Sequence, residues 1–597
     1  MKYPTLTELP TSRQMVDVFG GYNHNLRISE AEFYDMKNMS STNFPVLSPR
    51  GQRGVYATPA APQGIIAKDS LCYVDGTCFV MDEYRIDMGL STKEEDCPKK
   101  LVSMGAYVII LPDKKYINTA DVTDFGSIEA SVNTGANTPV SFTLCTIDGA
   151  AYDIAYSQAS EPAEPKNSAL WIDTSSVPHS LKQWSETSGM WVSIATTYVK
   201  ISCPGIGNAF SKYDGVIISG LSGVDLIDSA SGNVIVDDNI AALDGSFVLW
   251  DAGEDYIVVV GLIDVTRSIK NDIRIERRMP NLDFVIESEN RLWGCRYGTS
   301  VDGAVVNEIY ASKLGDFKNW NCFMGVSTDS YVASVGTDGQ FTGAITHLGH
   351  PLFFKENCLH KVYGNYPSNY QIQTTACRGV QKGCGESLAI VNEILYYKSR
   401  NAVCAYDGSL PAEASEQLGD VAYFDAVAGA SGNKYYVSMK DSVGEWCIFV
   451  YDTAKAMWHK EDNTRVDAFC SCRGEMYFID HADKKIKTML GSGTLDTLPV
   501  EWMAETGVLT TSMPDKKYLS RLTIRMALAI GTRVHIYAEY DSSGAWEHLF
   551  TMTGNNLRSF GVPIRPKRCD HMRLRFMGEG DAKIYSIAKT IEQGSDY

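Results

Sequence analysis

Hydrophobic and polar residues alternate along this chain in short segments, with little of the spacing that an amphipathic helix requires. Residues 101–111 (LVSMGAYVIIL), 434–439 (KYYVSM) and 446–451 (WCIFVY) are rich in β-branched and aromatic side chains, which favour strands. Fifty glycines punctuate the sequence, and turns such as Asp75-Gly76 separate neighbouring segments. The pattern therefore predicts an all-β protein.

One segment has a helical pattern. Residues 29–38 (SEAEFYDMKN) begin with Ser29, and Glu32 follows three residues later, which is the spacing of a helix-capping box. We therefore predict a short helix there.

A loose repeat joins the predicted strands into units. Each unit has a strand that ends in a small or polar residue, a second strand rich in aromatic residues, and a turn. Units of roughly 40–60 residues are typical of propeller blades. The pattern favours a β-propeller of six to eight blades, and stacked β-sandwiches are the alternative. The seven candidate units begin near Ile65, Leu101, Phe284, Phe341, Ser387, Val421 and Val466.

The charge is distributed unevenly and separates one region from the rest. The whole chain has a net charge of −18, and residues 119–265 account for −15 of it, with 19 Asp and Glu against 4 Lys. We predict an inserted acidic β-domain at 119–265, between propeller segments at 1–118 and 266–499. Regular amphipathic strands at 500–597 predict a C-terminal β-sandwich, jelly-roll-like in its topology.

Composition limits the classes of function. A pI near 5.1 argues against a basic surface that coats nucleic acid or docks on an acidic membrane. No window of about 18 uncharged apolar residues predicts a membrane span, and residues 1–20 lack the apolar core of a signal peptide. The fifteen cysteines include no CxxC pair, so we interpret them as reduced side chains in a protein that matures in a cytoplasm.

The candidates for catalysis and metal binding are weak. The chain has no GxSxG, Walker A, HExxH or Rossmann motif. His347 and His350 are three residues apart, but two ligands without a nearby carboxylate make a poor metal site. Glu287 and Glu289 cannot be shown by spacing to have the separation that a glycosidase needs. We expect no catalytic residue, metal or cofactor, and we expect His459 to face solvent in a charged turn.

Two other groups are candidates for binding. Arg565, Lys567 and Arg568 form a basic cluster that we interpret as an assembly interface, and Arg274, Arg277 and Arg278 form a second basic cluster. Trp171, Trp184 and Trp191 lie within 21 residues of one another and could stack on a sugar, although packing inside a small domain is the simpler explanation.

Motifs outside the acidic region resemble a known family in their order and spacing. They begin with Phe19-Gly20-Gly21-Tyr22-Asn23, the acidic segment 30–38 and 46–51 (VLSPRG). Further motifs follow in the middle of the chain. Together they resemble the tail nozzle and packaged-DNA stabilisation proteins of tailed bacteriophages. The further motifs are 290–293 (NRLW), 309–312 (IYAS), 319–320 (NW), 351–355 (PLFFK), 361–364 (KVYG), 384–385 (CG), 394–397 (ILYY) and 405–408 (AYDG).

The resemblance implies a virion structural protein without enzymatic activity. Such a propeller would form a cyclic ring, commonly a hexamer, below the portal and adaptor proteins, and would assemble in the host cytoplasm. The ring would continue the channel that retains double-stranded DNA and permits its ejection. The alternatives are a receptor- or carbohydrate-binding propeller at the tail tip and a glycoside hydrolase. We also expect the basic cluster Arg565, Lys567 and Arg568 to pair with the acidic region in the ring.

Overall fold

The computed structural model describes residues 11–300, 303–495, 498–509, 516–554 and 556–593. Within these ranges the chain forms 55 strands, and its only α-helix is the four-residue α1 (Asp238–Ala241). The all-β prediction is therefore confirmed. The chain divides into two compact units, unit 1 (Met1–Leu101, Gly339–Lys361 and Thr374–Tyr597) and unit 2 (Val102–Asp338 and Val362–Gln373). The predicted domains 1–118 and 500–597 include residues 1–10, 510–515, 555 and 594–597, which lie outside the described residues.

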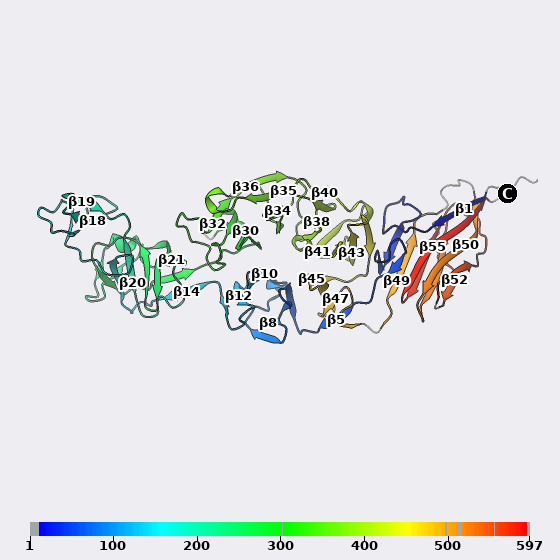
Figure 1. Cartoon of the computed structure of the whole chain (residues 1–597), viewed down its shortest axis with the longest axis horizontal. Helices are drawn as coiled ribbons and strands as arrows, with labels where there is room; N and C mark the ends of the chain where they lie inside the picture. Colours follow the sequence, from blue (N-terminus) through cyan, green and yellow to red (C-terminus); the bar gives the residue numbers. More distant parts are fainter. Residues whose placement is uncertain (1–10, 301–302, 496–497, 510–515, 555, 594–597) are drawn as a thin grey trace, which may run out of the picture. The chain divides into compact units, whose positions relative to one another are not determined.

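In unit 1, several antiparallel sheets are built from strands that follow one another in the chain (Figure 1). Tight turns make this possible: Gly76 has a φ of +60° between β7 and β8, a conformation that glycine adopts without strain. Three sheets of this kind have four consecutive strands each. The first is β6 (Pro62–Ala67), β7 (Leu71–Asp75), β8 (Cys78–Met81) and β9 (Tyr84–Asp87), and the second is β37 (Ala389–Val391), β38 (Ile394–Lys398), β39 (Val403–Tyr406) and β40 (Ala412–Glu413). The third is β41 (Tyr423–Ser431), β42 (Lys434–Asp441), β43 (Trp446–Asp452) and β44 (Met457–Lys460).

The inner strand β42 shows how these sheets stack. It is buried on both faces over residues 435–439. The ring of Tyr435 lies 5.5 Å from that of Tyr396 on β38, whereas Tyr436 packs in a cluster with Phe478 of β46 (Glu475–Asp480). Because successive side chains point to opposite faces, the sheet of β42 is covered by a neighbouring sheet on each side.

The sheet of β45 (Val466–Cys472), β46 and β47 (Ile486–Thr488) is completed by a strand from the start of the chain. β5 (Gly54–Ala57) pairs antiparallel with β47 and with β48 (Thr494–Leu495). A Cβ atom on Gly54 would lie 1.8 Å from the carbonyl oxygen of Ser492. Only glycine allows this approach, so Gly54 fixes where β5 joins the sheet.

We expect Gly54→Ala to lower the free energy of unfolding by about 3 kcal/mol, because the backbone of residue 492 must move to admit a methyl group. Gly51→Ala is the matched control, since a Cβ there has no neighbour within 4 Å. Urea unfolding followed by tryptophan fluorescence measures both variants. Equal stability of the two would contradict the close approach.

Two further sheets of unit 1 also take in strands from the start of the chain (Figure 1). β1 (Thr11–Val16) pairs with β55 (Ala582–Gln593), and β2 (Phe33–Lys37) pairs with β49 (Glu501–Thr506). Buried residues of both sheets, among them Ile524 and Phe576, belong to one hydrophobic cluster. The sheet orders are β1-β55-β50-β53 and β2-β49-β54-β51-β52, with β50 (Lys517–Leu528), β51 (Arg533–Tyr540), β52 (Glu547–Thr553), β53 (Arg558–Val562) and β54 (Met572–Glu579).

The predicted helix at 29–38 is wrong. The backbone N–H of Ser29 does donate to the carboxylate of Glu32 at 2.8 Å, as in a capping box, but the arrangement closes only a turn. Phe33 and Met36 are then buried in β2, which adds an edge strand beside β49. Pairing with a distant strand has overridden the local helical pattern.

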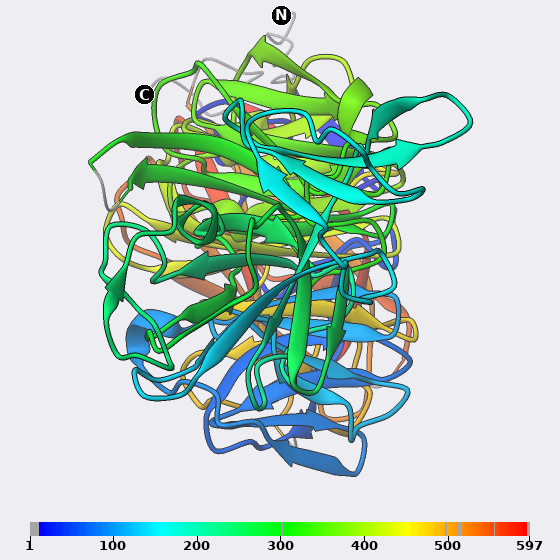
Figure 2. The ribbon, with the colours of Figure 1, turned by 90° about the vertical axis from the view of Figure 1, so that its left-hand side faces the viewer.

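Unit 2 contains a region with its own core. Its buried residues, including Phe142, Ile201, Val216, Ile257 and Ile275, form a cluster drawn entirely from residues 140–275. Strands of this region are coloured from cyan to green in Figure 2. Its larger sheets are β14-β28-β21-β24, β25-β26-β20-β15-β27 and β16-β17-β18-β19. Their strands are β14 (Ala130–Asn133), β15 (Val140–Cys145), β16 (Tyr156–Gln158), β17 (Leu170–Asp173), β18 (Ser180–Ser185), β19 (Met190–Ser193), β20 (Tyr198–Ser202), β21 (Gly215–Ser219), β24 (Gly245–Val248), β25 (Asp251–Gly253), β26 (Tyr256–Val260), β27 (Arg267–Ile269) and β28 (Arg274–Arg277).

Unit 2 also contains the sheet β29 (Phe284–Ser288), β30 (Arg291–Thr299), β31 (Val305–Ala311) and β32 (Tyr331–Ser334), and the sheet that includes β11 (Tyr107–Leu111) and β12 (Lys115–Asn118). A search of the described residues finds no helix with the length and apolar character needed to cross a membrane.

Candidate functional site

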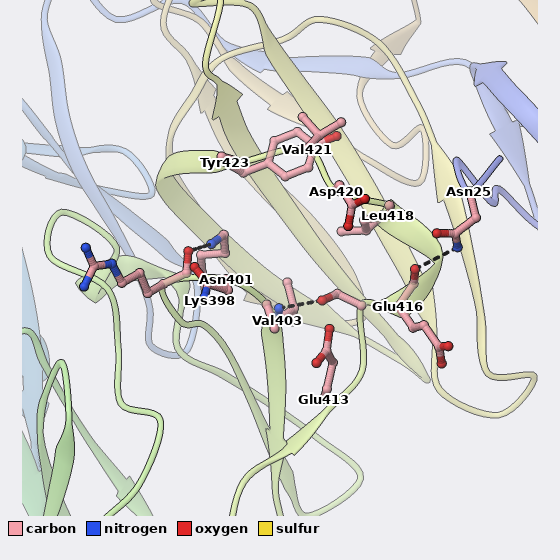
Figure 3. Close-up of a pocket in the computed structure, with 15 residues that line it drawn as sticks. Asn25, Lys398, Asn401, Val403, Glu413, Glu416, Leu418, Asp420, Val421 and Tyr423 are labelled. Carbon is pink, nitrogen blue, oxygen red and sulfur yellow. Dashed lines mark hydrogen bonds between the residues drawn. The ribbon is translucent and has the colours of Figure 1, made fainter.

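A polar cavity of about 430 Å³ lies in unit 1, where the β37–β40 and β41–β44 sheets meet the segment that contains Asn25 (Figure 3). The side-chain amide of Asn25 donates to the carbonyl oxygen of Glu416 at 3.0 Å, and the backbone N–H of Val403 donates to the Ser415 hydroxyl at 2.9 Å. These bonds fix the loop that follows β40. The ionisable side chains around the cavity are Lys398, Arg400, Glu413, Glu416, Asp420 and Tyr423.

Lys398 is the buried charge of this cavity. It ends β38 and is only 3% exposed, and its ammonium donates to the side-chain oxygen of Gln381 at 2.9 Å and to the carbonyl oxygens of Ser399 and Arg400. No carboxylate of the described residues forms an ion pair with it. Burial therefore lowers the pKa of the Lys398 ammonium below its ordinary value. The cavity thus combines exposed carboxylates with a desolvated cation, a setting that suits a small polar ligand.

We expect the free energy of unfolding of Lys398→Met to depend less on pH than that of the wild type. The pKa of Lys398 is lowered by folding, so the unfolded chain holds this proton more tightly, and wild-type stability rises with pH between the lowered pKa and the ordinary 10.5. Methionine removes this contribution. Urea unfolding of both proteins from about pH 7 to about pH 11 measures the difference, and parallel stability curves would contradict the assignment.

The three tryptophans of the sequence analysis come together on one face of the sheet β16 (Tyr156–Gln158), β17 (Leu170–Asp173), β18 (Ser180–Ser185) and β19 (Met190–Ser193). Trp184 lies opposite Trp191, and the Trp171 and Trp184 rings lie 5.3 and 5.5 Å from the Trp191 ring in edge-to-face contact. Tyr156 contacts Trp191 in the same way at 6.2 Å. The opposite face packs on the core of unit 2 through Ile172 and its neighbours. We call these four side chains the aromatic face.

The aromatic face keeps hydrogen-bonding capacity. Trp171 donates its indole N–H to the carbonyl oxygen of Gln158, but the buried indole N–H of Trp191 has no hydrogen-bond partner. Lys182 lies 4.8 Å above the Trp171 ring and forms an ion pair with Asp173 at 2.7 Å. Hydrogen bonds from Lys182 and Ser175 lower the pKa of Asp173 to about 2. The aromatic face therefore combines aromatic rings with the Lys182–Asp173 ion pair and with the unpaired indole N–H of Trp191.

The basic cluster of the C-terminal region lies between β53 and β54, and its side chains are exposed. Lys567 forms an ion pair with Glu547 and lies 4.7 Å from the centre of the Tyr540 ring. One of the three cations is therefore paired with a carboxylate of β52. Arg565 and Arg568 are exposed in the same segment.

The second basic cluster is not a basic patch. Arg277 is buried and forms an ion pair with Asp214 at 2.5 Å, and both Arg274 and Arg278 form ion pairs with Glu276. The guanidinium groups stabilise β28 and the loop before β21 (Gly215–Ser219), so their charges are compensated within unit 2.

The three histidines singled out by the sequence lie in strands of unit 1. His347 and His350 pair across the hairpin of β33 (Gly343–His347) and β34 (His350–Lys355), with the predicted turn at Gly349. The prediction that His459 faces solvent is wrong, because it lies buried in β44, where burial lowers its pKa to about 3. No group of three or more His, Cys, Asp or Glu side chains in the described ranges is placed to hold a metal ion.

The two glutamates considered for a glycosidase have local roles. Glu287 accepts the backbone N–H of Asn290 at 2.9 Å, and Glu289 adopts a φ of +52° in the turn between β29 and β30. They stabilise a hairpin of unit 2.

Comparisons with known proteins give a limited result. No family model and no curated protein matches the chain. Among solved structures, the chain is similar to an exo-β-1,3-galactanase from Phanerochaete chrysosporium bound to galactose, with 8% identity and a TM-score of 0.21 over 51% of this chain and 94% of that one. An engineered GH43 glycoside hydrolase with endo-xylanase and exo-arabinofuranosidase activity matches with 8% identity and a TM-score of 0.20, over 52% and 96%. A third glycoside hydrolase has 10% identity and a TM-score of 0.19, over 50% and 96%.

These matches contradict the expectation that the chain has no enzymatic activity, because all three structures are glycoside hydrolases. The expectation depended on the absence of short catalytic motifs, whereas two carboxylates that act together can be far apart in the sequence.

Proposed function

We propose that the chain is a virion protein of a tailed bacteriophage, a ring of the tail nozzle that continues the DNA channel below the portal and adaptor. In this proposal copies of the chain form a cyclic ring, commonly of six, through which double-stranded DNA is retained and then ejected. The ring assembles in the host cytoplasm and becomes part of the tail.

The proposed scaffold is a seven-bladed β-propeller with an inserted acidic β-domain and a C-terminal β-sandwich. Support comes from sheets of consecutive strands and from the packing of β42, which is covered on both faces as an inner blade strand would be. The blades would be β6–β9, β10 (Lys100–Met104) to β13 (Phe125–Ser127), β29–β32, β33 to β36 (Gln371–Ala376), β37–β40, β41–β44, and β45–β47 with β5.

The observation that carries the proposal is how the start of the chain is held. β1, β2 and β5, all within residues 11–57, complete three sheets whose other strands come from residues 466–593. Neither β1 nor β55, the first and last described strands, can leave its sheet without breaking the hydrogen bonds that join it to the neighbouring strands. A ring that bears the pressure of packaged DNA needs this resistance to unravelling, because strands joined across a sheet separate only when several hydrogen bonds break together.

Motifs behind the family resemblance take part in these junctions. The ring of Tyr22 lies 5.5 Å from that of Phe449, and the backbone N–H of Tyr22 donates to the carbonyl oxygen of Trp458 at 2.6 Å. Arg50, from the segment VLSPRG, forms an ion pair with Asp462 at 3.0 Å. The resemblance therefore falls on residues that join the N-terminal segment to the sheets of unit 1.

Electron microscopy of the purified protein tests the proposal. We expect negatively stained particles to be closed rings with a central channel. Monomers at every concentration, with the fold intact by circular dichroism, would contradict it.

Binding of a carbohydrate is a second candidate function, favoured by the aromatic face and the unpaired indole N–H of Trp191. Indole rings stack on sugars, and a buried donor without a partner can bond to a hydroxyl. We expect Trp184→Ala to weaken retention on immobilised host glycans roughly tenfold, which corresponds to ~1.4 kcal/mol. Trp446→Ala, which changes a tryptophan of unit 1, is the control. No retention of the wild type on any glycan would contradict this candidate.

A further inference from the structure

One face of the sheet β1-β55-β50-β53 carries three arginines. Arg13 on β1 and Arg521 on β50 both lie opposite Thr590 of β55, so their side chains point to the same face. Arg525 is four residues further along β50, opposite Ser586, and so lies on the same face. All three are exposed, whereas the alternate residues of β50 are buried in the core. We call this surface the arginine face.

A row of four residues, one from each strand, crosses the sheet between the arginines. Met15 of β1 lies opposite Ala588, which lies opposite Thr523, and Thr523 lies opposite Gly561 of β53. Met15, Ala588 and Thr523 of this row line a groove of about 510 Å³ that Arg13 and Arg521 also line. Met15 is 63% exposed, so an apolar side chain stands beside the cations.

The carboxylate that lines this groove, Glu592, does not pair with the arginines. Among the described residues, none of the three forms an ion pair with a carboxylate. Instead, Glu592 accepts a hydrogen bond from the Tyr518 hydroxyl, with 2.6 Å between the two oxygens. A cationic surface with an exposed methionine and small residues around it suits a partner that brings carboxylates and flat apolar groups.

The acidic region of the same sequence carries such a surface. Between residues 148 and 186, five carboxylates are exposed, against the single exposed lysine Lys166. The same stretch holds Trp184 of the aromatic face, and Trp191 follows shortly after. Guanidinium groups pair with carboxylates and also stack on indole rings, so this surface offers both kinds of contact. The five carboxylates belong to Asp148, Asp153, Glu161, Glu164 and Glu186.

We propose that the arginine face binds the acidic and aromatic segment 148–191 of a second copy of the chain, head to tail. This inference rests on the proposed ring. Two different surfaces meet, so the contact is heterologous, and repetition of such a contact by a closing rotation gives a ring. We infer a second copy as the partner rather than DNA, because a chain with a net charge of −18 repels a polyanion. The acidic region carries −15 of that charge and can attract the arginines of another copy.

A charge swap tests the inference. The triple variant R13E/R521E/R525E is expected to weaken self-association roughly 100-fold, measured by mass photometry and sedimentation velocity at low salt. Adding E161K/E164K/E186K to the same chain restores complementary charges and is expected to restore the ring. Reversal of the rival basic cluster, R565E/K567E/R568E, is expected to leave association within about threefold of the wild type. Thermal unfolding followed by circular dichroism shows that each variant keeps its fold.

Each outcome is informative. A ring that survives R13E/R521E/R525E, or a triple variant that the lysine changes do not rescue, overturns the inference and leaves the proposed ring standing. Duplex DNA retained by the wild type and released by the triple variant overturns it in favour of a nucleic-acid surface. A wild-type protein that is monomeric at every concentration overturns the proposed function itself.

Discussion

Arg53→Met is expected to lower the free energy of unfolding by about 3–5 kcal/mol, because it leaves two carboxylates buried with half of their counter-charge. Arg53 forms ion pairs with Glu461 at 2.6 Å and with Asp462 at 2.9 Å, and Arg50 reaches the same acids at 3.5 and 3.0 Å. The Arg53 and Glu461 side chains are 10% and 6% exposed, so water cannot replace the missing partner. Urea unfolding at neutral pH measures the loss.

The same network predicts an acid-dependent effect. Burial alone would raise the pKa of Asp462, but the charges of Arg53 and Arg50 and the hydrogen bonds from Thr464 lower it well below its ordinary value. A carboxyl whose pKa is lowered by folding stabilises the protein above its ordinary pKa, and this contribution is lost as the pH falls towards the folded value. The difference between wild type and Arg53→Met is therefore expected to shrink below about pH 4.

Lys37→Met is the matched control for Arg53→Met. The ion pair of Lys37 with Glu501 is exposed, at 48% and 68% for the two side chains, so its loss is expected to cost less than about 1 kcal/mol. Equal losses for the two variants would show that burial of the Arg53 network contributes nothing.

Trp458→Ala is expected to lower the free energy of unfolding by about 3–5 kcal/mol, the range for truncating a fully buried aromatic side chain. Trp458 is 0% exposed in β44, and its indole N–H donates to the carbonyl oxygen of Ala414 at 2.7 Å. Its ring also packs 4.9 Å from that of Tyr451. The truncation would leave a cavity and an unpaired carbonyl where the two sheets meet the N-terminal segment.

Trp446→Ala is the control for Trp458→Ala, because it also removes a tryptophan but one that is only half-buried. Trp446 is half-buried in β43, with the Arg465 guanidinium 5.0 Å above its ring. We expect its truncation to cost about 1 kcal/mol. Chemical denaturation followed by circular dichroism compares the two variants, and a loss for Trp446→Ala as large as that for Trp458→Ala would contradict the assigned packing.

Much of the fold could be predicted because strand patterns are local. Segments such as 434–439 and 446–451 became β42 and β43, since aromatic and β-branched residues fit a sheet surface whatever their partner. What failed depended on distant partners. Residues 29–38 have a helical pattern, and only β49, more than 460 residues away, makes Phe33–Lys37 a strand.

The candidate sites show the same limit. The three tryptophans could be singled out because they are close in sequence, and the register of β18 and β19 then brought Trp184 and Trp191 together. The sequence analysis missed Lys398, although a lysine that directly follows the apolar run ILYY is a signal of a buried charge. The arginine face could not be found, because Arg13 and Arg521 share a surface only through β55.

The pairing of β1 with β55 has a consequence for the synthesis of the protein. Of the described strands, β1 leaves the ribosome first and β55 last, and at about 5–20 residues per second the interval between them is roughly half a minute to two minutes. Until then, β1 has no partner and the arginines of β1 and β50 lie on no common surface. A chain whose synthesis stops before β55 therefore lacks the arginine face. Only chains that include β55 can form the proposed contact.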